Sequence, residues 1–232
     1  MGKPFLKPTG DDTFEIVYEN GGDDFDFIDA LALSRRQEAA KDFEGACNTR
    51  LDSFRHLVDL VPDEGETILE WEDDNAQAAV VTGYWSGIDH FLIGDWDMAA
   101  AIFEMLLEVD PEDHMEATVP LAYTYLAMEE YDSFDEVIND VNDKFADKVV
   151  LRLWSEFRRT GKIDAGELNR LRNHFAPYYA EFISPEHPVD SKYFADISGE
   201  RPTKEALARE LWLQTEHLWQ LFPGFIEALR QN

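Results

Sequence analysis

The sequence lacks the cysteine pairs that a disulfide framework needs. Its 232 residues include one cysteine, Cys47, so no internal disulfide can form and the fold does not depend on oxidation. It also lacks a long apolar run, because the longest mostly apolar stretch, residues 76–94, is interrupted by polar residues such as Asp89 and His90. No segment resembles a secretory signal. We therefore expect a cytoplasmic protein without a membrane-spanning segment.

Positive charge is scarce, and it is missing from the middle of the chain. Lys and Arg number 20 against 49 Asp and Glu, which gives a net charge of −29. Residues 56–143 contain no Lys or Arg but 24 Asp and Glu, whereas residues 144–232 contain 13 of each sign. Such a surface repels phosphate backbones and anionic lipids, so we expect no nucleic-acid and no membrane partner. The acidic block is either a solvated surface or the footprint of a basic partner.

Motifs that carry chemistry are absent as well. Phosphate-binding loops, dinucleotide fingerprints, paired-His zinc motifs and EF-hand spacing do not occur, and none of the 6 His has another His three or four residues further on. Cys47 stands alone and is expected to be a buried structural thiol. No residue set amounts to an active site. We therefore name no catalytic residue, metal ligand or cofactor, and we do not favour an enzyme.

Apolar residues, in contrast, are plentiful at 44%, enough for a packed core. From residue 25 onward they recur at helical spacing, in runs that end at turn signals such as Pro62 and Pro111. Residues 14–18 alternate like a strand. The pattern predicts an all-α fold of antiparallel helical hairpins that follows a short extended N-terminal arm, residues 1–24.

The chain divides by composition into the arm, a helical repeat domain and a C-terminal part. The helical domain is expected over residues 25–183. Residues 184–232 form a connector and a helix that is apolar on more than one face, and we assign them to the same domain. Such a helix is buried on several sides, so it either caps the helical stack or forms a dimer contact.

An internal repeat connects the central helices. Four residues follow the turn Gly94–Asp97 at intervals of 4, 3 and 5: Ala99, Phe103, Leu106 and Pro111. This segment resembles the second half of a tetratricopeptide repeat. Trp96 and its counterpart in the next copy, Tyr131, are 35 residues apart, one more than the family's period. The resemblance covers residues 83–140 and implies hairpins stacked as an α-solenoid.

The resemblance implies that the first helix of each hairpin lines an inner groove. Carried over by position, the apolar groove residues are Tyr84, Ile88, Phe91, Tyr123 and Leu126, and the acidic rim is Asp95, Asp97, Glu129 and Glu130. The family's groove for acidic chaperone tails needs Lys, Arg and Asn, so that ligand class is excluded here. We expect a scaffold or adaptor module that binds a basic or amphipathic peptide or protein. The alternative for these aromatic residues is a place in the core.

Two other functions remain open from the sequence. One is an enzyme or small-ligand protein whose site is assembled from distant helices, which a deep pocket with converging His and carboxylates would favour. The other is an acidic nucleic-acid mimic that competes for a basic surface. An open face with apolar anchors would favour the interaction module.

Overall fold

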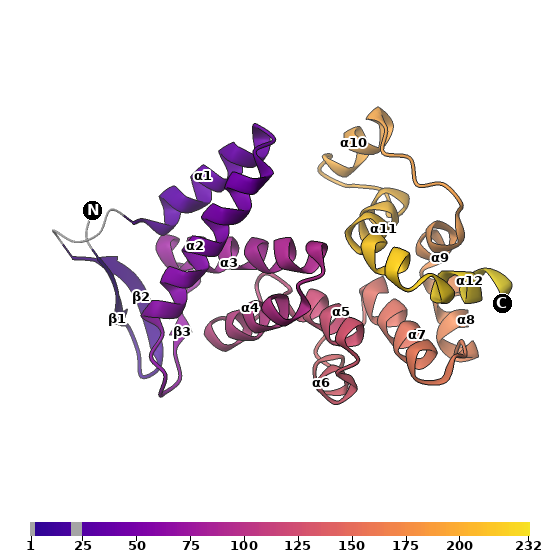
Figure 1. Cartoon of the computed structure of the whole chain (residues 1–232), viewed down its shortest axis with the longest axis horizontal. Helices are drawn as coiled ribbons and strands as arrows, with labels where there is room; N and C mark the ends of the chain where they lie inside the picture. Colours follow the sequence, from indigo (N-terminus) through magenta and orange to yellow (C-terminus); the bar gives the residue numbers. More distant parts are fainter. Residues whose placement is uncertain (1–2, 20–24) are drawn as a thin grey trace. The chain divides into compact units, whose positions relative to one another are not determined.

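The computed structural model describes residues 3–19 and 25–232 (Figure 1), so residues 1–2 and 20–24 of the expected arm lie outside the described residues. The described part is mostly helical and contains one small three-stranded sheet. The strands are β1 (Pro4–Pro8), β2 (Thr13–Tyr18) and β3 (Ile68–Leu69). The helices are α1 (Phe27–Ala39), α2 (Phe43–Leu60), α3 (Asp74–Ile93), α4 (Trp96–Val109), α5 (Thr118–Met128), α6 (Tyr131–Val137), α7 (Ala146–Thr160), α8 (Ala165–His174), α9 (Ala176–Ile183), α10 (Ser191–Ile197), α11 (Lys204–Leu221) and α12 (Pro223–Gln231). A mainly helical protein is therefore confirmed, and the sheet is an addition to it.

Internal contacts divide the chain into two compact units. The first comprises residues 1–124 and the second residues 125–232, so the division falls inside α5. The first unit contains the sheet and α1 to α4, and the second contains α6 to α12. The domain boundaries expected from composition, at residues 24 and 183, remain a prediction.

The expected extended arm is a β-hairpin that joins a third strand. β1 and β2 pair antiparallel from Pro4 opposite Tyr18 to Pro8 opposite Phe14, and β2 pairs parallel with the two residues of β3. Prolines at both ends of β1 argue against a strand, which is why the sequence did not reveal it. The strand tolerates both prolines because the register points their nitrogen atoms away from β2. The pairing with β2 therefore loses no hydrogen bond.

Helix ends follow the capping signals of the sequence. Side chains that accept a backbone N–H at a helix start are Asp26, Asp42, Asp73, Asp164, Asp190 and Thr203. α3 and α7 end in left-handed glycines, Gly94 and Gly161. Pro177 is the second residue of α9 and Pro120 lies in the first turn of α5, and a proline is tolerated at both places.

The first unit is built around the pair α3–α4, with α1 and α2 packed as a second hairpin (Figure 1). A Cβ atom on Gly87 would lie 2.5 Å from Cε1 of Phe103, so glycine is what lets this ring reach the backbone of α3. Gly83 makes a similar approach to Leu106, at 3.1 Å from an added Cβ. Ala99, at the start of α4, is fully buried. The residues of the repeat-like pattern are thus the ones that bring α3 and α4 together.

The second unit has an aromatic core. The ring of Trp219 on α11 lies 5.2 Å from Trp154 of α7, 5.6 Å from Phe182 of α9 and 5.3 Å from Phe225 of α12. These four side chains are at most 4% exposed. α11 is therefore buried on several sides within its own unit, as expected for a helix with more than one apolar face.

Candidate functional site

Three of the five apolar residues predicted to line a groove are core residues. Phe91, Tyr123 and Leu126 are 3%, 2% and 0% exposed. Large apolar side chains at helical spacing are typical of a packed core, and the burial of these three places them there. They offer no open surface, which corrects the prediction that they contact a ligand. Tyr84 and Ile88 are half-buried on α3.

The four predicted acidic residues are all exposed: Asp95, Asp97, Glu129 and Glu130. Two of them have partners. Nδ1 of His90 lies 3.0 Å from Oδ2 of Asp95, and Arg158 donates to Oε1 of Glu129 at 2.7 Å. The first two acids belong to the first unit and the other two to the second. Such exposed carboxylates interact weakly with single charges but add to a long-range field.

An exposed apolar group surrounds the α3–α4 turn. Leu92, Ile93 and Met98 are 45%, 76% and 38% exposed, and Asp95 and Asp97 lie between them in the chain. We call these five residues the Ile93 patch. Sequence reasoning did not single out Ile93, because spacing alone cannot show which side of a helix end stays uncovered. The available signal was its position about 200° around the helix from the buried Phe91.

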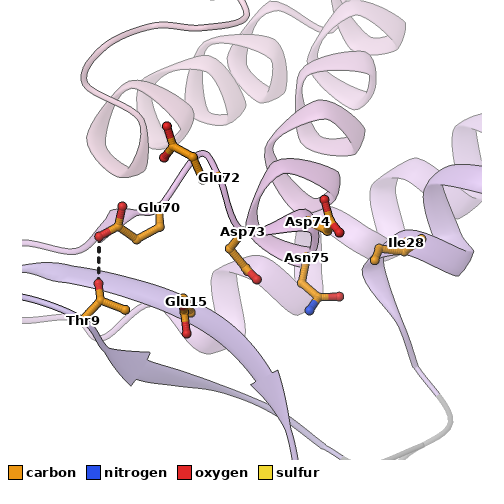
Figure 2. Close-up of a pocket in the computed structure, with 8 residues that line it drawn as sticks. All are labelled: Thr9, Glu15, Ile28, Glu70, Glu72, Asp73, Asp74 and Asn75. Carbon is orange, nitrogen blue, oxygen red and sulfur yellow. Dashed lines mark hydrogen bonds between the residues drawn. The ribbon is translucent and has the colours of Figure 1, made fainter.

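A cavity of about 420 Å³ opens between the sheet and the start of α3 (Figure 2). Its lining contains five carboxylic acids: Glu15, Glu70, Glu72, Asp73 and Asp74, with Thr9, Ile28 and Asn75. The hydroxyl of Thr9 donates a hydrogen bond to Glu70 at 2.8 Å. This bond links the residue that follows β1 to the residue that follows β3. Lys7 reaches Glu15 at 2.9 Å, and this contact raises the pKa of Lys7. The lining has no His or Cys, so its chemistry is that of a negative electrostatic surface.

A buried arginine joins the first three helices. Arg50 of α2 donates to Asp89 of α3 at 3.0 Å and to Glu38 of α1 at 2.8 Å. Its guanidinium also lies 5.7 Å from the ring centre of Trp85. Cys47 is half-buried beside this cluster, and burial, together with its hydrogen bond to Asp89, raises its pKa to about 11. The thiol is therefore protonated at neutral pH and is a poor nucleophile.

The loop between α4 and α5 is held by its own acidic side chains. Asp113 has a φ of 52° and accepts the backbone N–H of Ala117 at 2.6 Å. Burial raises the pKa of Asp113. Nδ1 of His114 lies 2.7 Å from Asp110, and its ring stacks on Trp71 at 4.3 Å. This loop is fixed against the β3–α3 connection, and the contacts explain its shape without a ligand.

The described residues contain no evident metal centre, and the comparisons identify no relative. Among residues 3–19 and 25–232, no three His, Cys, Asp or Glu side chains are grouped to hold a metal ion. Within the same ranges, every helix is too short or too polar to cross a membrane. Comparisons with protein-family models, curated proteins and solved structures find no match to the chain. The function must therefore be argued from the surfaces themselves.

Proposed function

We propose that the protein is an interaction module and that the Ile93 patch binds a basic, amphipathic segment of a partner protein. One observation carries the proposal. Three exposed apolar side chains lie beside Asp95 and Asp97 in a stretch, residues 56–143, that contains no Lys or Arg. A partner with an apolar stripe and basic flanks complements both features.

The two parts of the patch have different roles. Ile93 is 76% exposed, and covering an aliphatic side chain of this size contributes about 1.5–3 kcal/mol. Leu92 and Met98 extend the apolar contact. Asp95 and Asp97 attract the basic flanks and act mainly on the association rate. Glu129 and Glu130 belong to the second unit and are not part of this patch.

The architecture that we propose for the module is a stack of tetratricopeptide-like hairpins. The support is local: Gly87 admits Phe103, and Ala99 is buried at the crossing of α3 and α4. In such a stack α11 caps the end. Leu207 and Leu221 remain exposed on α11, so a dimer contact through this helix can also be tested. The proposed location is the cytoplasm, where the single cysteine stays reduced.

A synthetic peptide tests the binding proposal directly. The probe is a fluorescent helix-forming peptide of Leu and Lys, about 18 residues long so that it can fold on binding, and its counterpart has Glu in place of Lys. Fluorescence anisotropy measures its affinity for the full chain. We expect Ile93→Ser to weaken binding of the Lys peptide about tenfold. The matched control is Leu221→Ser, because Leu221 is also well exposed, at 60%, but lies outside the acidic block.

The outcomes separate the candidate functions. Equal affinities of Ile93→Ser, Leu221→Ser and the unmodified chain would remove the Ile93 patch from the proposal. If binding were then abolished by salt, charge alone would be responsible, which favours an acidic mimic. Binding of the Glu peptide as tightly as the Lys peptide would contradict charge complementarity. Both serine variants replace exposed residues, so their free energies of unfolding should stay within about 0.5 kcal/mol of that of the parent.

A further inference from the structure

The connection between α9 and α11 contains a long stretch without a buried residue. Ser184 at the end of α9 is fixed, because its carbonyl accepts a hydrogen bond from Arg230 at 2.7 Å. None of the residues 185–202 that follow is buried, although they include α10. Phe194 of α10 is 55% exposed. Segments with few buried contacts open at a lower cost in free energy than the rest of a domain.

The elements on either side do not need this stretch in order to pack. α9 and α11 contact each other directly. Phe182 of α9, which is fully buried, lies with its ring 5.3 Å from Trp212 of α11. The core of the second unit can therefore persist while residues 185–202 detach.

One histidine fastens the stretch to these two helices. The ring of His187 stacks on Trp212 at 3.9 Å with an angle of 16°, and its Nδ1 lies 2.6 Å from Oε1 of Glu181. Arg209 of α11 donates hydrogen bonds from two nitrogens to the same carboxylate. A third nitrogen donates to the carbonyl of Pro188 at 2.6 Å. The side chains of His187 and Glu181 are 12% and 9% exposed. This is the best-covered contact of the stretch.

The other attachments are polar and lie nearer the solvent. The hydroxyl of Tyr193 donates to Glu210 of α11. Asp196 accepts both the backbone N–H and the hydroxyl of Thr203, at 2.9 and 2.6 Å. Water competes for such bonds, so each contributes little to holding α10 in place. The position of the stretch therefore depends most on His187.

We propose that residues 185–202 are a releasable strap with His187 as its latch. The site that His187 occupies, between the ring of Trp212 and the carboxylate of Glu181, is a binding site for a planar nitrogen group, an imidazole or a guanidinium. The stacked ring and the buried carboxylate are the two features that recognise such a group. The indole N–H of Trp212 is itself buried and has no hydrogen-bond partner among the described residues.

Hydrogen exchange of the full chain tests both parts. Amides of α10 should exchange faster than those of α9 and α11 in the unmodified protein. His187→Ala should raise exchange in α10 about tenfold, the change expected for one charge-assisted hydrogen bond, and leave α11 unchanged. Imidazole added to this variant should restore protection, and it should not do so when Glu181→Gln is also present. The matched control is His56→Ala, because His56 also stacks on a ring, that of Phe25 at 3.7 Å, in the first unit.

Three results would overturn the proposal. Equal exchange of α10 and α11 in the unmodified chain would mean that no separate strap exists. Unchanged α10 exchange in His187→Ala would mean that His187 is not the latch. Failure of imidazole to restore protection would remove the binding site. If His187→Ala does not fold, His187→Gln replaces it, because an amide keeps a donor for Glu181 but loses the stacking on Trp212.

Discussion

A single carboxylate oxygen of Asp73 accepts the backbone N–H of Ile16 at 3.0 Å, although 57 residues separate the two. The same oxygen accepts the N–H of Ala76 at 2.9 Å and so caps α3. Asn75 donates its side-chain amide to the carbonyl of Ile16 at 3.0 Å. Together Asp73 and Asn75 pair with β2 where the two-residue strand β3 has ended. The start of α3 is thereby fixed to the sheet.

Asp73→Ala should destabilise the first unit by about 2–3 kcal/mol, since it removes a helix cap and leaves the N–H of Ile16 without its partner. The matched control is Asp74→Ala. Asp74 is adjacent and exposed, and it should change the free energy of unfolding by less than about 1 kcal/mol. Urea unfolding followed by circular dichroism measures both values. Equal effects of the two substitutions would mean that the bond from Ile16 does not stabilise the fold.

Gly87→Ala should cost about 1–3 kcal/mol, because the added methyl group would overlap the ring of Phe103. The control is Gly224→Ala, where an added Cβ meets Phe157 at an ordinary 3.5 Å and improves helix propensity. The control should therefore be neutral or stabilising in thermal unfolding. The smaller side chain in Phe103→Leu should relieve part of the cost of Gly87→Ala. Strictly additive losses would contradict the close contact between α3 and α4.

The thiol of Cys47 should react slowly with alkylating reagents at neutral pH. Burial and the neighbouring Asp89 raise its pKa to about 11, so at pH 8 about one molecule in a thousand carries the thiolate. Asp89→Asn removes the negative charge and should accelerate alkylation several-fold by lowering this pKa. The rate is measured with iodoacetamide between about pH 7 and pH 11, a range that covers the free thiol and the buried one.

The control for Cys47 must also disturb Arg50, because Asp89 is a partner of both residues. Glu38→Gln meets this need, since Glu38 pairs with Arg50 from α1. It should leave the alkylation rate nearly unchanged. A rate increase as large as that of Asp89→Asn would show that loosened packing, and not the charge of Asp89, controls the thiol.

Stability should fall at alkaline pH. Burial raises the pKa of Cys47 from 9.0 to about 11 and that of Tyr18 from 10.0 to about 12. Both groups stay protonated longer in the folded chain, so their contribution is complete below about pH 9 and is lost as the pH rises toward 12. Urea unfolding midpoints measured between about pH 9 and pH 12 should fall less steeply with pH in Cys47→Ala and in Tyr18→Phe than in the parent. Slopes equal to that of the parent would contradict this assignment.

Local signals in the sequence predict most of the helices and few of the long-range contacts. α2 ends at Leu60, two residues before Pro62, and α9 begins at Ala176, one residue before Pro177, because proline and capping residues act on their own neighbours. The strand β1 could not be predicted, since its pairing with β2 depends on register and its own composition argues against it. The bond between Asp73 and Ile16 has no local signal at all.

The same distinction between local and long-range signals applies to the candidate site. The exposure of Asp95 and Asp97 agrees with the expectation that acids in an apolar-rich block remain in water. Phe91 and Tyr123 were predicted as ligand contacts and are buried instead, because helical spacing identifies an apolar stripe without showing what covers it. Ile93 is proposed as the main anchor for the opposite reason, because its side chain is left exposed.

Association kinetics of the Lys peptide test the central proposal most directly. Stopped-flow measurements at about 50 and 500 mM salt span Debye lengths from over 10 Å to about 4 Å. We predict that the association rate constant falls at least tenfold over this range while the dissociation rate changes little. In the double variant Asp95→Asn, Asp97→Asn, the association rate should be lower at low salt and depend less on salt. An association rate that is independent of salt in the unmodified chain would contradict the proposal that the acidic block recruits a basic partner.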